Sequence, residues 1–276
     1  MAGNRLQRIL AAAWPRVLAI GILLGIWQLL VIAGVQSPGG EPLPGPGDTI
    51  SEIGYLAHTG VLLPALLQTL QRAAVGYVLA LVLGTLVGLA VVRVPVLRAG
   101  IGSLLAGLQS LPSFVWVPIA AVFLAIGGQV EYAVYFVVIM GAFPSIAMGL
   151  MSSYDNIPPL TFSLARSMGA RGPGYYRHFI FSATLPGYVA GMKQAWAFSW
   201  RSLMAAELII GSTANAGLGQ ILDNGRSLTD LPEILAAMLM ILVVGIAVND
   251  VVFSPLERGL LRRRGLVPAA AFRGGF

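Results

Sequence analysis

Long apolar runs dominate the pattern of hydrophobic and polar positions along this chain. A helix that crosses the hydrocarbon core of a membrane needs about 20 largely apolar residues. Runs near that length recur along the sequence, and stretches rich in glycine, proline or arginine separate them. The predicted spans are residues 17–35, 73–92, 104–126, 132–151, 189–210 and 234–253. The pattern therefore predicts an all-α integral membrane protein with six transmembrane helices.

The predicted span 104–126 contains two prolines, Pro112 and Pro118, with Trp116 between them. Because proline lacks a backbone N–H, we expect a kinked helix or a helix with an irregular start. A bend of this kind serves either as a moving gate or as a fixed kink, and the residues leave both interpretations open. Pro112, Trp116 and Pro118 are therefore candidate gate residues.

Composition supports the membrane assignment. Hydrophobic residues make up 57% of the 276 residues and charged residues only 10%, whereas a soluble domain carries about 25% charged residues. The mean hydropathy is +0.82. The chain has no cysteine, which excludes disulfide frameworks and thiolate metal sites.

The net charge of +6 comes from arginines that gather in alternate segments between the predicted spans. Cytoplasmic loops of membrane proteins carry an excess of Lys and Arg, so the basic segments predict that both termini are cytoplasmic. The resulting segments are a cytoplasmic N-terminus (1–16), a first span (17–35), an external loop (36–72) and a basic cytoplasmic tail (257–276). The opposite loops are acidic and hold only Arg72 and Arg226 as basic residues. Since the charges orient the chain in lipid, no nucleic-acid partner is expected.

Motifs for catalysis are missing from the sequence. There is no G-x-x-x-x-G-K-[ST] phosphate loop, and no H-E-x-x-H or G-x-S-x-G. The two histidines, His58 and His178, fall on opposite sides of the predicted membrane and cannot share a site. We therefore expect no catalytic residue, no metal site and no cofactor bound by this chain, which is not expected to be an enzyme.

The predicted cytoplasmic loop 155–187 is longer than a simple turn requires. Pro158 and Pro159 end the preceding helix, and 160–168 starts another, with Leu164, Ala165 and Met168 on one face. Gly169 ends this short helix or lets another backbone approach closely, and 172–174 is predicted to turn before a second helix. A partner protein or the lipid headgroups are the two alternative binding surfaces for such a segment.

Residues 163–182 resemble the EAA loop of bacterial binding-protein-dependent ABC importer permeases, E-A-A-x3-G-x9-I-x-L-P. Ala165 matches the second Ala, Gly169 the Gly, and Phe179 the apolar Ile position, while Ser163 replaces the acidic residue and Leu164 the first Ala. The stretches LQSLPSFVWVPIAAVFLAIG, SWRSLMAAELI and GLGQIL are similar to the taurine, alkanesulfonate, nitrate and bicarbonate permeases. The resemblance covers roughly residues 40 to 260.

That resemblance implies a type I ABC importer permease fold with a core at 73–256. It implies that the segment docks on separate ATPase subunits through Ser163, Leu164, Ala165, Arg166, Met168, Gly169 and Ala170. The implied partners are two ATP-binding subunits that carry ATP and Mg²⁺, a second copy of the chain, a periplasmic or lipid-anchored solute-binding protein, and membrane lipid. The implied location is the bacterial plasma membrane, as a multi-pass protein, and the implied cargo is a small anion such as a sulfonate or nitrate.

The predicted fifth span carries Lys193, Arg201 and Glu207. At about 1.5 Å per residue, Arg201 lies about 12 Å along the helix from Lys193 and so near the middle of the membrane, where it must face protein or water. Trp200, Arg201 and Glu207 are candidate pathway or gate residues. The alternatives are a buried ion pair or hydrogen bonds at a subunit interface, and direct recognition of an anionic substrate by the Arg201 guanidinium. A secondary transporter or channel that uses Arg201, Glu207 and Asp250 as a relay is the rival function.

Overall fold

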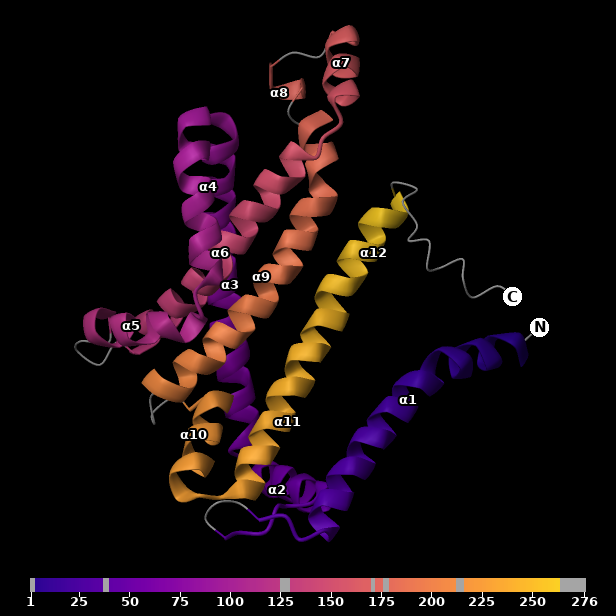
Figure 1. Cartoon of the computed structure of the whole chain (residues 1–276), viewed down its shortest axis with the longest axis vertical. Coiled ribbons are helices and arrows are strands. Elements are labelled where there is room, and N and C mark those ends of the chain that lie inside the picture. The colour runs from indigo at the N-terminus through magenta and orange to yellow at the C-terminus, as the bar shows by residue number, and fades with distance from the viewer. Residues whose placement is uncertain are drawn as a thin grey trace. The chain divides into compact units, whose positions relative to one another are not determined.

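The fold is described from a computed structural model, which covers residues 3–36, 40–124, 130–169, 172–175, 179–211 and 216–263 (Figure 1). The helices are α1 (Gly3–Ile32), α2 (Pro46–His58), α3 (Leu62–Arg93), α4 (Pro95–Ser110), α5 (Trp116–Leu124), α6 (Val130–Asp155), α7 (Pro159–Ser167), α8 (Gly172–Tyr175), α9 (Phe181–Ile210), α10 (Leu218–Leu228), α11 (Leu231–Val248) and α12 (Ser254–Arg263). A 3-10 turn covers Ser113–Val115, and a π-helical segment, Asn249–Phe253, joins α11 to α12. Within these described ranges no strand forms, so the all-α prediction is confirmed.

Apolar helices of membrane-crossing length occur where the sequence predicts them. In the described part of the chain, Leu62–Arg93, Val130–Asp155 and Leu231–Arg262 are long and apolar enough to cross a membrane. Val96–Ser110 and Ser113–Phe123 make a fourth span if they are counted together. The other two predicted spans fall on a shorter apolar helix, Val17–Ile32, and on α9, whose three charged residues set it apart.

Several predicted boundaries differ from the structure. The helix that contains the predicted span 73–92 begins earlier, at Leu62, because Leu62 and the leucines that follow continue the apolar helical pattern. The loop predicted to end at 187 ends at Ile180, since α9 begins at Phe181 and runs through Pro186. The turn predicted at 172–174 is part of the short helix α8, and Gly172 takes a left-handed φ of +61°.

The predicted bend near Pro112 is confirmed. The axes of the two helical pieces on either side of Leu111 and Pro112 differ by 97°. Leu111 is extended, at φ −70° and ψ 131°, because the ring of a following proline disfavours the helical conformation. Pro118 lies in the first turn of α5, where a missing N–H costs no helical hydrogen bond.

Two compact units make up the chain, residues 1–63 with 221–239, and residues 64–220 with 240–276. In the first unit, the Trp27 indole N–H donates to the Pro44 carbonyl at 3.0 Å, which ties α1 to the segment before α2. Burial raises the pKa of the Glu52 carboxyl above its usual value, and the negative charges of Asp230 and Glu233 add to that shift.

The second unit is built around close contacts of α6 with α3 and α9 (Figure 1). A Cβ on Gly84 of α3 would lie 2.7 Å from the Phe143 carbonyl oxygen of α6. A Cβ on Gly149 of α6 would lie 2.7 Å from Cα of Gly191 in α9. Glycine is therefore required at these crossings, and the G-x-x-x-G of α3, Gly84 with Gly88, packs closely against another helix as such motifs do.

Candidate functional site

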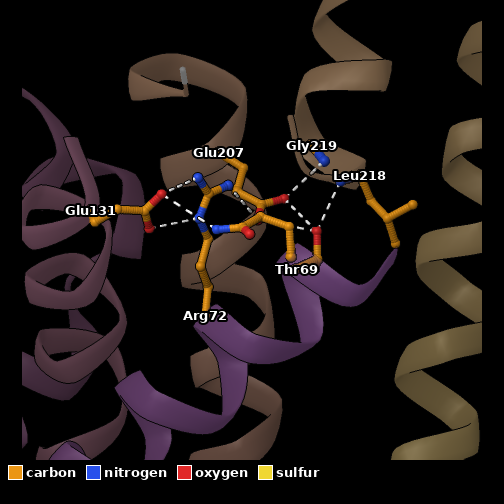
Figure 2. A network of polar contacts seen from close by, with 7 residues as sticks. Thr69, Arg72, Glu131, Glu207, Leu218 and Gly219 are labelled. Carbon is orange, nitrogen blue, oxygen red and sulfur yellow. Dashed lines mark hydrogen bonds and ion pairs between the residues drawn. The ribbon is translucent and has the colours of Figure 1, made fainter. Parts of the chain in front are cut away.

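A buried ionic network joins α3, α6 and α9 within the second unit. The Arg72 side chain is fully buried and donates through Nε to Glu131 Oε2 at 2.9 Å and through Nη2 to Oε1 at 2.5 Å. Its Nη1 donates to Glu207 Oε1 at 3.1 Å, and Glu207 is fully buried too (Figure 2). A buried guanidinium needs such partners, because an unpaired charge in low dielectric is costly.

Glu207 also caps the N-terminus of α10. Its Oε2 accepts the Gly219 backbone N–H at 3.0 Å, while the Thr69 hydroxyl donates to the same oxygen at 2.9 Å and accepts the Leu218 N–H at 2.8 Å (Figure 2). The first N–H groups of a helix lack partners within the helix and favour negative charge. The Glu207 carboxylate thus accepts hydrogen bonds both from the N-terminus of α10 and from the Arg72 guanidinium.

The two glycines at the start of α10 make room for this carboxylate. A Cβ on Gly217 would lie 2.4 Å from Glu207 Oε1, and a Cβ on Gly219 would lie 2.5 Å from Glu207 Cβ. Any larger residue at either position would collide with the side chain that caps the helix. The G-L-G of the GLGQIL stretch is therefore explained by the close approach of Glu207 to the backbone.

The predicted spans place Arg72 and Glu131 in loops, and their pairing with Glu207 is not among the contacts expected from sequence. A signal for it exists, because Arg72 directly precedes the predicted span 73–92, Glu131 directly precedes 132–151, and Glu207 lies three residues before the end of 189–210. By the predicted topology, all three positions sit at the same membrane surface. Shared depth combined with opposite charge predicts the contact.

Arg201 lies on a different face of α9 from Glu207 and lines a cavity of about 370 Å³. The guanidinium carbon sits 4.7 Å from the centre of the Phe198 ring, and Nε donates to the Ala197 carbonyl at 3.2 Å. Among the described residues, no carboxylate forms an ion pair with Arg201, whose side chain is exposed. The site therefore presents a cation to whatever occupies the cavity.

Three of the six predicted pathway residues line this cavity together, namely Pro112, Trp116 and Arg201. The other three lie elsewhere. Glu207 belongs to the ionic network, Pro118 is exposed on α5, and Trp200 is buried with its ring stacked at 6.0 Å on Trp196. Sequence proximity grouped Trp200 with Arg201, but consecutive residues of a helix point about 100° apart.

The α7 segment presents an apolar stripe to its surroundings. Leu160, Leu164 and Met168 are exposed at spacings of four residues, with 77%, 53% and 67% of their surface accessible. Ala165 is buried instead, so it does not share the exposed face as predicted, and α7 also contacts the end of α6 through a Phe162–Tyr154 ring pair at 6.2 Å. Gly169 ends the segment with φ +70°, and Ala170 lies outside the described residues.

Lys193 and Asp250, two other charged residues of the predicted spans, contact neighbouring side chains outside the buried network. Lys193 Nζ lies 2.8 Å from Glu257 Oε2 in a half-exposed ion pair, and Asp250 accepts from the Asn249 amide at 3.1 Å. Among the residues that the structure covers, no group of three or more His, Cys, Asp or Glu side chains is placed to hold a metal ion.

Comparison with known proteins identifies the family. The model of the binding-protein-dependent transport system inner membrane component matches residues 76–260, which is more than half of the chain. The chain is 25% identical over 239 residues to a putative ABC transporter permease protein of Methanocaldococcus jannaschii, covering 85% of this chain and 84% of the relative. It is 26% identical to the nitrate import permease protein NrtB of Leptolyngbya laminosa, covering 86% and 84%.

A further relative is the putative aliphatic sulfonates transport permease protein SsuC of Bacillus subtilis, which is 25% identical and covered over 88% of this chain and 85% of its own length. The matched residues 76–260 include Glu131 and Glu207 of the ionic network, the lining of the Arg201 cavity and α7. The chain belongs to the family of binding-protein-dependent transport system inner membrane components, the permease subunits of ABC transporters.

Proposed function

We propose that this permease forms the translocation path for a small anionic solute, of the nitrate or alkanesulfonate class, in an ATP-driven importer. The observation that carries the proposal is Arg201, an exposed guanidinium without a carboxylate partner among the described residues, at a cavity inside a membrane helix bundle. An arginine in that position is costly unless it meets water or an anion. Relatives named for nitrate and sulfonate transport support the same chemistry.

The coupling part of the proposal rests on α7. A stripe of exposed apolar side chains, Leu160, Leu164 and Met168, flanked by the polar Ser163 and Arg166, fits a groove on a soluble partner better than it fits water. We assign this stripe, with Gly169 behind it, to the ATPase subunits. ATP and Mg²⁺ are bound on those subunits, and this chain converts their closure into a change of access.

The assembly that follows is a homodimer of the permease with two ATPase subunits and an external solute-binding protein. In this assembly each chain crosses the bacterial plasma membrane six times and keeps both termini in the cytoplasm. The arginines near α1, α4, α7 and α12 support that orientation through the positive-inside rule. This orientation places α7 in the cytoplasm, where it can contact an ATPase subunit.

Arg201→Ala in the reconstituted transporter is expected to lower uptake of the anion by about tenfold or more, while the ATPase subunits still co-purify. The wild-type complex is first assayed with nitrate and with an alkanesulfonate, and the anion that it imports is used. Arg201→Lys should retain part of the activity, because it keeps the charge but loses the planar fork that matches an oxyanion.

Arg226→Ala is the matched control, since Arg226 is 70% exposed in a helical-spacing pair with Asp223 and should leave uptake unchanged. Normal uptake by Arg201→Ala contradicts the proposed role of Arg201. Loss of folding in Arg201→Ala also contradicts it, because that result shows that Arg201 stabilises the fold. Import of neither anion, together with import of a neutral or cationic solute, contradicts the substrate class.

Gly169→Asp is expected to lower the ATPase stimulation produced by the loaded binding protein by about tenfold, which corresponds to ~1.4 kcal/mol of docking free energy. No atom lies within 4 Å of a Cβ at this position, so the added side chain meets no neighbour inside the chain, although φ is +70° and any side chain there strains the backbone. Gly169→Asn is the control, because Asn tolerates the left-handed backbone equally well and adds no charge. Unchanged assembly and unchanged coupling in Gly169→Asp contradict the assignment of α7.

A further inference from the structure

A second cavity, of about 500 Å³, lies beside the Arg201 cavity in the same unit. Its lining is rich in neutral hydrogen-bonding side chains and includes no charged one. They are Gln109, Ser145, Ser152, Ser153, Asn156 and Gln194. Polar space of this kind inside a membrane protein is costly unless water or a polar ligand fills it.

The two cavities follow one another along the same pair of helices. On α9, Gly187, Ala190 and Gln194 line the second cavity. Phe198, Arg201 and Ala205 continue the same row into the first, at steps of three or four residues. Such steps keep side chains on one face of a helix. At about 1.5 Å per residue, Gln194 lies about 10 Å from Arg201 along the axis.

Helix α6 carries a matching row in the opposite direction. Gly141 lines the first cavity, and Ser145, Ser152 and Asn156 line the second, again at helical steps. Figure 1 shows α6 and α9 running alongside each other, and the second cavity lies toward the ends of both helices that lead to α7. The two rows therefore line a continuous path through both cavities, which we call the track; it starts at Arg201 and ends near the end of α6 that leads to α7.

One side chain divides the track. Gln109 is the residue common to the linings of both cavities, and its Nε2 donates to Ser145 Oγ at 2.9 Å. It belongs to the last turn of α4, directly before the break at Leu111 and Pro112, where the chain bends by 97°. A change of that bend that shifts α4 against α6 also moves Gln109 relative to Ser145 and so changes the hydrogen bond.

The linings also differ in how strongly they hold an anion. The first cavity offers the Arg201 guanidinium, and hydrogen bonds to charged groups are about twice as strong as those between neutral groups. The second offers neutral donors such as the Gln194 amide and the Ser152 hydroxyl. Conduction requires binding that is favourable enough for entry and weak enough for release. An anion that moves toward α7 passes from the cationic cavity, which binds it more strongly, to the neutral cavity, which binds it more weakly and so favours release.

We propose that the second cavity is a transit site for the anion on the α7 side of the membrane, and that the Gln109–Ser145 hydrogen bond is the partition between it and the Arg201 cavity. The proposal rests on the proposed function for the direction of movement. It assigns Gln109 as a gating residue for passage and assigns no ATPase contact to it.

The absence of cysteine in this chain makes the partition directly measurable. Ser110→Cys reports on the first cavity, Ser152→Cys on the second, and Ser103→Cys, which lies on α4 outside both linings, is the control. Each is introduced into the full transporter, reconstituted without ATP. Anionic and cationic methanethiosulfonate reagents are then applied from the external side or from the α7 side, and modification is read on the permease chain by mass.

With external reagent, we expect Ser110→Cys to react faster with the anionic than with the cationic form, and Ser152→Cys to react at least about tenfold more slowly than Ser110→Cys. Adding Gln109→Ala should raise the external rate at position 152 by about tenfold, without changing the rate from the α7 side or the rate at position 103. With Gln109→Glu, external reagent should modify Ser152→Cys faster in its cationic than in its anionic form, because the variant places an anion in the partition.

Equal external rates at position 152 with and without Gln109→Ala overturn the partition, even if Arg201→Ala abolishes uptake as proposed. Equal acceleration at positions 103 and 152 overturns it too, because that pattern reports general loosening of the bundle. A normal partition combined with unimpaired uptake in Arg201→Ala contradicts the proposed function instead. The two failures are therefore distinguishable.

Discussion

Glu207→Gln is expected to destabilise the protein by about 3 kcal/mol, the low end of the range for breaking a buried ion pair. Arg72 is fully buried and loses one of its two carboxylate partners, while Glu131 still neutralises it. The glutamine can accept the Gly219 N–H only by turning its own N–H₂ toward the guanidinium. At about 2–4 °C per kcal/mol for a chain of this size, the midpoint of thermal unfolding in detergent should fall by about 6–12 °C.

Glu257→Gln provides the matched control for this prediction. It makes the same chemical change in an ion pair whose side chains, those of Lys193 and Glu257, are 36% and 35% exposed. Exposed pairs contribute at most about 1 kcal/mol, so the midpoint should shift little. Equal shifts for Glu207→Gln and Glu257→Gln would show that the buried network contributes no more than a surface pair.

A double variant separates the ion pair from general damage to the site. Adding Arg72→Met to Glu207→Gln removes both members of the buried pair, so the double variant should be less destabilised than the sum of the two single variants. Residues in direct contact show such coupling, whereas independent residues show additive losses. Strict additivity contradicts the network as the source of the effect.

Apolar runs predicted the helices of this chain well, because hydropathy is a property of each segment by itself. Residues 73–92 and 132–151 lie inside helices that the structure shows, and the bend follows from the Pro112 ring, which disfavours a helical conformation at Leu111. The pairing of Arg72 with Glu207 joins positions 135 residues apart and depends on how the helices pack. Hydropathy alone places Arg72 and Glu131 in loops and Glu207 in a span, and only the common depth of the three charges in the predicted topology indicates that they meet.

The candidate site was predicted in part for the same reason. Arg201, Trp116 and Pro112 stood out as unusual residues in apolar spans, and they meet in one cavity. Nothing in the sequence pattern distinguishes Gln109 and Ser145, because a glutamine and a serine are ordinary residues of a membrane helix. Their importance arises only from their contact across α4 and α6.

Gly149→Val is the second change with a large expected effect. A Cβ at this position meets Cα of Gly191 at 2.7 Å, and a backbone atom cannot move aside as a flexible side chain can. Overpacking of this kind costs about 1–3 kcal/mol, occasionally more, and it forces α6 and α9 apart. The midpoint of thermal unfolding should fall, and Gly149→Ala should give a smaller fall in the same direction.

Gly107→Val separates this packing effect from the general effect of valine in a helix. Gly107 lies inside α4, and no atom is within 4 Å of a Cβ there, so valine should be neutral or slightly stabilising by its better helix propensity. Equal destabilisation at both positions contradicts the close crossing of α6 and α9. Because both cavities are lined by these two helices, Gly149→Val should also widen the track and raise the external reactivity of Ser152→Cys, even with Gln109 unchanged. The small residues at the crossing thus set the separation of the two helices that line both cavities.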